Sequence, residues 1–251
     1  MIYKDKGIVI KSKEYIGADK IITLLSPDKG IEYFILKGVI KSKSKKLNSS
    51  EIGAFIKLNY YKKHSDAPSF ASEVKIVNSF PGIKNNYKKT LLLNYIMELF
   101  LLLYNKEDSK QLFNFLYNIL IEMSKVKEIT NTFLRYIEYR LIQINGIFPD
   151  IRRCEICGQD IYKNFYYNKI NNQIKCSNCS NQNDIKIDSS FLNQLNENNI
   201  KTINNIKIGK ENNNTIFQFF YGIILNYTHK EIKSYKIIHQ ILKTGDGALL
   251  Y

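Results

Sequence analysis

The sequence contains no apolar run long enough to cross a membrane and no secretory signal at its first residues. The best spanning candidate, residues 91–103, is shorter than the roughly 20 residues that a transmembrane helix needs, and it includes Asn94 and Glu98. This run therefore predicts a core helix of a bundle. Residues 1–7 lack the apolar segment of a signal peptide. We expect a soluble, cytoplasmic protein whose cysteines stay reduced.

Motifs of the common enzyme classes are absent as well. The sequence has no H-E-x-x-H, no P-loop and no G-x-G-x-x-G. Its three histidines are scattered, and no cluster of acidic residues suggests a magnesium site. A nuclease or another enzyme acting on nucleic acid is therefore disfavoured, and we expect no enzymatic activity.

Cysteine is scarce, and its spacing is informative. The only four cysteines form two C-x-x-C pairs, Cys154 with Cys157 and Cys176 with Cys179. Each pair can direct two thiolates at one point, and two pairs complete a tetrahedron of sulfur around a soft divalent ion. The spacing predicts one structural Zn²⁺ ion that has no open position for catalysis.

Three other roles for these cysteines remain open. Two disulfides would need an oxidising compartment. A redox-active C-x-x-C usually occurs singly and near a βαβ unit, whereas two pairs flank a short polar stretch in this chain. An iron–sulfur cluster is chemically allowed but less typical of paired spacing.

Acidic residues are few in comparison with basic ones. The chain has 23 Asp and Glu against 37 Lys and Arg, which gives a net charge of +14. This excess favours an acidic partner, above all nucleic acid. The composition is also rich in Lys, Asn and Ile, as an AT-rich genome would make it. Such a bias explains the choice of Lys over Arg but not the excess of cations.

Half of the excess charge lies in residues 1–80, which contain fifteen Lys and eight acidic residues. Residues 37–46, the basic segment, contain no acid, and Ser alternates with Lys there, so we expect a mobile loop between two strands. Such a loop can follow a phosphate backbone, because each ammonium group displaces condensed counterions. The alternative is a loop whose lysines are only solvated and bind no partner. The predicted DNA-binding residues are Lys11, Lys13, Lys37, Lys41, Lys43, Lys45 and Lys46.

Aromatic residues near the basic segment can stack on the bases of a single strand. Because alternate residues of a strand face inward, about two of the five rings should reach solvent. The five are Tyr33, Phe34, Phe55, Tyr60 and Tyr61.

Arginine occurs only four times. In a Lys-rich chain, a retained Arg suggests a planar, bidentate contact that Lys cannot make, and an internal salt bridge is the alternative. Arg135 and Arg140 lie on one predicted helix.

Periodicity divides the chain into a β-rich first part and a helical remainder, so the expected fold class is α+β. Five β-rich runs with turn signals predict a small antiparallel barrel or sandwich in residues 1–80. Residues 81–251 are expected to form a helical domain, with Gly146 ending its third helix. A Cys₄ hairpin at about residues 150–185 is inserted in that domain. The Asn-rich stretches 196–199 and 212–214 are expected to be surface loops.

The most specific longer pattern runs from residue 133 to residue 158 and reads FLRYIEYRL, then NGIFPD, then RCEICG. It joins a helix, a Gly stop, a Pro and the first cysteine pair in one register. Residues 7–26 and 30–38 add two further matching stretches. On these residues the chain resembles the bacterial RecO family of DNA repair and recombination mediators. The resemblance covers nearly the whole chain and weakens after about residue 185.

This resemblance implies an OB-fold barrel and a zinc-ribbon-like hairpin. It implies a nucleoid-associated protein that binds single- and double-stranded DNA and anneals complementary strands. It also implies contact with the acidic C-terminal tail of the single-strand-binding protein, for which Arg135 and Arg140 are the candidate residues. It further implies action with RecR in loading RecA onto coated DNA. The basic segment carries Lys where many relatives carry Arg. Lys can still bind the phosphate backbone of DNA, but it cannot make the bidentate contact that Arg makes. A zinc-stabilised adaptor that binds only proteins is the alternative function.

Overall fold

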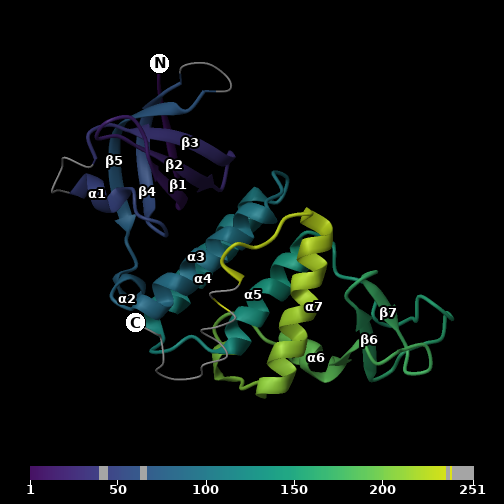
Figure 1. Ribbon diagram of the computed structural model, residues 1–251. Coiled ribbons are helices and arrows are strands. Elements are labelled where there is room, and N and C mark those ends of the chain that lie inside the picture. Colours follow the sequence, from purple (N-terminus) through teal and green to yellow (C-terminus); the bar gives the residue numbers. More distant parts are fainter. Residues whose placement is uncertain (40–44, 63–66, 236–237, 239–251) are drawn as a thin grey trace. The chain divides into compact units, whose positions relative to one another are not determined.

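The computed structural model describes residues 1–39, 45–62, 67–235 and 238 (Figure 1). The chain divides into two compact units, residues 1–127 and residues 128–251. The first unit contains a closed barrel and helices, and the second contains helices and a small sheet. The predicted α+β class is therefore confirmed.

Five strands close the barrel in the order β1-β2-β3-β5-β4, which is an OB-like arrangement. All strand pairs are antiparallel except the pair of β3 and β5, which is parallel. Of the two predicted arrangements, the structure shows the barrel and not the sandwich. The prediction of antiparallel strands is right for every pair except β3 with β5. The strands are β1 (Ile2–Glu14), β2 (Lys20–Ser26), β3 (Gly30–Leu36), β4 (Phe55–Tyr61) and β5 (Ser69–Asn78).

Alternating side chains fill the barrel, as a period of two requires. In β4, Ile56 and Leu58 are buried in the core, whereas Lys57 between them is exposed. Of the five rings considered in the sequence, Tyr33 and Tyr61 are exposed by 51% and 47%, which confirms the expected number. The buried core cluster consists of Val9, Ile22, Leu24, Phe34, Leu36, Val39, Ala54, Ile56, Leu58 and Tyr60.

Helices complete the first unit, so this unit extends beyond the barrel. The buried Lys89 in α3 donates from Nζ to the carbonyl oxygens of Gly82 and Val126, at 3.1 and 2.5 Å. This ammonium group thereby ties the start of α3 to α2 and to the end of α4. Its burial lowers the pKa of Lys89. The helices are α1 (Lys45–Ser49), α2 (Pro81–Lys84), α3 (Tyr87–Leu102) and α4 (Ser109–Lys125).

The second unit is built around α5 and α7, which pack against each other, and a sheet with the strand order β7-β6-β8. Thr130 caps α5, because its hydroxyl accepts the N–H of Phe133 at 3.2 Å. Gly146 follows the end of α5 with φ +64°, the left-handed conformation predicted for it. The elements are α5 (Asn131–Ile144), β6 (Asn164–Asn168), β7 (Gln173–Lys175), β8 (Ile185–Asp188), α6 (Ser189–Glu197), η1 (Ile203–Asn205) and α7 (Lys210–Thr228).

The prediction of a surface loop at residues 212–214 is wrong. These residues lie in the first turns of α7, and Asn213 is buried. Polar composition alone indicated a loop, but the helix begins at Lys210 because its apolar residues must face α5 over several turns. No helix in the part of the chain that the structure describes is long and apolar enough to span a membrane.

Candidate metal centre and nucleic-acid surface

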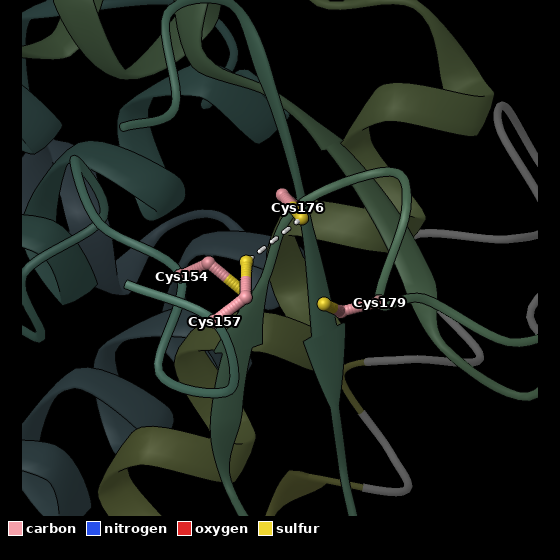
Figure 2. Close-up of side chains that lie close together, drawn as sticks. All are labelled: Cys154, Cys157, Cys176 and Cys179. Carbon is pink, nitrogen blue, oxygen red and sulfur yellow. Dashed lines mark hydrogen bonds between the residues drawn. The ribbon is translucent and has the colours of Figure 1, made fainter. Parts of the chain in front are cut away.

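The four cysteines converge on one point in the second unit. Their sulfur atoms all lie within 4.8 Å of one another, and Cys157 Sγ lies 3.7 Å from Cys176 Sγ. Figure 2 shows the four side chains facing a common centre. None of the four forms a disulfide. The two C-x-x-C pairs thus form one cluster, as their spacing predicts.

Backbone hydrogen bonds hold the two pairs at this distance. The first pair lies in a turn before β6, and the second pair begins directly after β7. Glu155 N–H donates to the carbonyl oxygen of Ile174 at 2.9 Å, and its carboxylate accepts the N–H of Ile174 at 3.2 Å. These two bonds join the first turn to the antiparallel β6–β7 hairpin. The position of each sulfur atom therefore depends on the whole hairpin.

The first turn closes through Gly158. Its N–H donates to the carbonyl oxygen of Cys154 at 2.8 Å, and its φ is +73°. A side chain at this position would be strained in the left-handed region, which explains a glycine directly after the second cysteine. The sequence motif C-x-x-C-G thus encodes the turn as well as two ligands.

The cluster favours negative charge at one cysteine and resists it at another. Burial opposes ionisation of Cys154, but hydrogen bonds from the backbone at Cys157, Cys176 and Ile156 outweigh it and lower its pKa to about 6. Hydrogen bonding with the Cys157 sulfur, together with the neighbouring Cys154 charge, raises the pKa of Cys179 to about 12. Four thiolates at this spacing therefore need a cation to neutralise them.

The geometry fits one metal ion with four sulfur ligands. A tetrahedral Zn²⁺ with Zn–S bonds of about 2.3 Å separates its sulfur ligands by about 3.8 Å. The 3.7 Å between Cys157 and Cys176 matches this spacing, and the remaining sulfur atoms lie close enough to complete the shell. Such a shell would leave no position for substrate on the metal.

An internal salt bridge supports the segment after the second cysteine pair. Lys175 Nζ lies 3.1 Å from Asp184 Oδ2, and both side chains are at least nine-tenths buried. The same carboxylate accepts the side-chain amide of Asn168 at 2.6 Å and the N–H of Asn181 at 2.9 Å. Burial opposes the charge of Asp184, but these donors prevail and lower its pKa.

Three of the seven predicted DNA-binding lysines have described side chains. Lys11, Lys13 and Lys37 are exposed on the barrel, and no ion pair involves them among the described residues. The ammonium of Lys37 lies 5.0 Å from the centre of the Phe70 ring. Lys41 and Lys43 lie outside the described residues. Lys45 and Lys46 begin α1, where the sequence predicts a loop, and their side chains are not described.

Comparison with known proteins agrees with this architecture. The family model for the N-terminal part of recombination protein O matches residues 1–80, and the model for its C-terminal part matches residues 84–236. The chain belongs to the RecO family. It is therefore a DNA repair and recombination protein, in the class of non-enzymatic recombination mediators.

Individual relatives of the RecO family cover most of the chain. DNA repair protein RecO of Leptospira biflexa is 27% identical over 183 residues, which is 71% of this chain and 72% of the relative. The protein of the same name from Thermodesulfovibrio yellowstonii is 29% identical over 181 residues, or 72% and 71% of the two chains. That of Syntrophus aciditrophicus is 22% identical over 265 residues and covers 97% of both chains.

The two arginines proposed as partner contacts in this RecO-family chain differ in exposure. Arg135 is fully buried, lies 2.7 Å from Glu138 and places its guanidinium 4.1 Å from the centre of the Phe217 ring. A docked peptide cannot reach it in this structure, so the salt-bridge alternative describes Arg135 better than partner contact does. Arg140 is half-buried and donates to the Gln143 side chain at 2.9 Å. Its role as a contact stays a prediction.

Three exposed lysines of the barrel, Lys6, Lys57 and Lys75, are not among the predicted DNA-binding residues. They belong to three different strands that neighbour one another in the closed barrel. These three lysines lie far apart in the sequence, so no local cluster of charge marks them. The only signal available was the alternation of side chains along each strand, which places them on the outer face.

Proposed function

We propose that this RecO-family protein binds single- and double-stranded DNA through the barrel and anneals complementary strands. With RecR, it would then help to load RecA onto DNA that is coated by the single-strand-binding protein. The observation that carries the proposal is the set of exposed barrel lysines without an acidic partner among the described residues, in a chain of net charge +14.

Annealing needs no catalytic group. Two strands repel each other through their phosphates, and a basic surface screens this repulsion while it holds the strands close together. Lys11, Lys13 and Lys37 supply ammonium groups that are open to solvent. The same barrel exposes Tyr33 and Tyr61, on which bases can stack.

We further propose that the metal is one Zn²⁺ ion, held by Cys154, Cys157, Cys176 and Cys179. Four sulfur ligands at tetrahedral spacing support this choice, because thiolates prefer soft cations and a closed shell suits a structural zinc site. The ion would brace the β6–β7 hairpin and take no part in strand pairing.

The salt dependence of binding to a single-stranded oligonucleotide tests the role of the basic segment. A variant with Lys41, Lys43, Lys45 and Lys46 changed to Ala removes four of its lysines. Each lost phosphate contact should reduce the slope of log K against log salt by about 0.7. The matched control changes four exposed lysines of helices and loops to Ala, namely Lys88, Lys106, Lys110 and Lys127.

A flatter slope in the first variant and an unchanged slope in the control support DNA binding through the basic segment. Equal slopes in both variants would remove the segment from the interface. If the wild-type protein does not bind the oligonucleotide even in dilute salt, DNA binding itself is wrong. The protein-only adaptor then remains as the alternative function.

A further inference from the structure

Three lysines of the barrel stand in one row across neighbouring strands. In the pairing of β1 with β4, Lys6 is directly opposite Lys57, and in the pairing of β4 with β5, Lys57 is directly opposite Lys75. All three side chains are exposed. Neighbouring strands lie about 4.8 Å apart, so this lysine row is about 10 Å long.

Such a row is unfavourable for the barrel alone. Like charges directly opposite each other in a sheet destabilise the pairing. Neither of two nearby acids forms an ion pair with the row: Asp5 pairs with Lys29 at 3.3 Å, and Glu73 accepts the side-chain amide of Asn59 at 2.7 Å. Among the described residues, no ion pair involves any member of the lysine row. The row is thus open to an anion from outside the chain.

The shape of the surface suits a linear polyanion. A lone phosphate would need donors gathered around one point, whereas these ammonium groups are spread along a line. The lysine row, Lys4 and Lys29 line an open groove of about 430 Å³, in which these five lysines outnumber the three acids Asp5, Asp28 and Glu73. The groove gives an extended anionic chain a path over the outer face of the barrel.

Aromatic side chains continue this path along the strands. Tyr61 follows Lys57 at an interval of four residues in β4, so both side chains point outward. A register shift after Asn59 brings Tyr61 opposite Phe70 of β5. Lys37, the first residue of the basic segment, places its ammonium 5.0 Å from the centre of the Phe70 ring. Asn59 and Glu73 lie between the lysine row and these rings and hydrogen-bond to each other, so this face also carries one carboxylate. Beyond this pair, Tyr61 and Phe70 lead to the basic segment.

The length of this path matches several nucleotides. Lys75 and Phe70 are five residues apart in β5, which is about 17 Å along a strand. Ammonium groups on both sides of the exposed Tyr61 ring and the half-buried Phe70 ring favour nucleic acid over an acidic peptide, because bases stack on aromatic faces while phosphates pair with lysines.

We infer that a single strand of nucleic acid runs along the outer face of β4 and β5, from the lysine row over Tyr61 and Phe70 to Lys37. This β4–β5 track rests on the proposed DNA binding and assigns the face of the barrel that carries it. It differs from the face of strands 2 and 3, on which OB-folds commonly bind oligonucleotides. Tyr33 of β3 marks that other face and is as exposed as Tyr61.

Paired single variants test the track on the full-length protein. The affinity for a single-stranded oligonucleotide is measured for Tyr61→Ala and for the matched control Tyr33→Ala. Loss of one stacked base should weaken binding about five-fold or more in Tyr61→Ala. The triple variant Lys6→Gln, Lys57→Gln and Lys75→Gln should reduce the salt slope by about 2. The control for the triple variant changes Lys88, Lys106 and Lys110 to Gln.

The outcomes separate the track from the function on which it rests. Weaker binding by Tyr61→Ala and by the lysine-row variant, with both controls unchanged, supports the track. If Tyr33→Ala weakens binding and Tyr61→Ala does not, the strand lies on the other face and the track is wrong, although DNA binding stands. Loss of acidic-peptide binding in the lysine-row variant, with oligonucleotide binding intact, also overturns the track. Absence of oligonucleotide binding by the wild-type protein overturns both proposals.

Discussion

The hydroxyl group of Tyr167 in β6 fills the space beside Gly222 in α7, so closely that a Cβ atom on residue 222 would overlap it. Burial raises the pKa of Tyr167 to about 12. The hydroxyl donates to the side chain of Asn172, at the turn between β6 and β7. This contact, together with the packing of the Phe165 and Tyr167 rings on Phe219, joins the cysteine hairpin to the helical core of the second unit.

Adding a methyl group at this contact should destabilise the second unit. We expect Gly222→Ala to cost about 1–3 kcal/mol, because overpacking forces the tyrosine ring or the helix to move. Tyr167→Phe removes the hydroxyl that the methyl group meets first. The double variant should therefore lose less stability than the sum of the two single variants, measured by denaturant unfolding. Simple additivity would show that the contact is not tight in solution.

Loss of a cysteine should remove the metal and spare the barrel. We expect Cys154→Ser to bind no stoichiometric Zn²⁺ and to lose more than about 4 kcal/mol of stability, since the loss of a metal is among the few changes with so large an effect. Metal analysis of the reduced, purified wild-type protein should find one Zn²⁺ per chain. Less than about half an equivalent would contradict the zinc assignment.

The same variant separates metal binding from DNA binding. The oligonucleotide should bind Cys154→Ser and the wild-type protein with the same salt slope, because the proposed contacts lie in residues 1–80. Cys157→Ser, at the exposed member of the same pair, is the matched comparison. A lower slope in both variants would show that the hairpin takes part in the interface.

The acid sensitivity of the hairpin should depend on Asp184. Because its folded pKa is lowered, this carboxylate contributes stability that is present above its unfolded value of 3.8. The contribution is lost as the pH falls through the lower, folded value. The free energy of unfolding of Asp184→Asn should therefore be below that of the wild type at neutral pH, and the gap should narrow below about pH 4. Acid releases the metal from both proteins, so this effect cancels in the difference between their free energies of unfolding.

Local patterns predicted the elements of this fold well, but not the contacts between distant strands. β-rich runs between turn signals predicted the five barrel strands, and Gly146 marked a helix end. The parallel pairing of β3 with β5 had no local signal, since it depends on how the intervening chain returns. Polar composition misled at residues 212–214, where tertiary packing extends α7.

The sequence likewise predicted one part of the candidate site and not the other. The cysteine spacing predicted the four-sulfur cluster, because each pair brings two ligands together by itself. The lysine row could not be predicted, because Lys6, Lys57 and Lys75 meet only through the registers of two strand pairs. Arg135 carried a visible i,i+3 partner in Glu138, but only the structure shows that Phe217 covers its guanidinium.

Arg140 is the remaining candidate for the acidic tail of the single-strand-binding protein. Arg140→Ala should weaken the binding of an acidic tail peptide about ten-fold if a charged hydrogen bond is lost. The control is Arg152→Ala, whose side chain is 84% exposed beside the metal hairpin. Undiminished affinity in a peptide titration would place the tail elsewhere on the protein.

Arg135 and Glu138 form a fully buried ion pair, so their contribution is best measured together. Removal of one partner leaves a buried charge without its counterion, and we expect Arg135→Met to cost about 3–5 kcal/mol of stability. Replacing both residues, as in Arg135→Met with Glu138→Leu, should restore much of this loss, because apolar residues of similar volume avoid the desolvation of two charges. Denaturant unfolding of the single and double variants measures the coupling. A double variant as unstable as the sum of the single variants would show that the two side chains act independently.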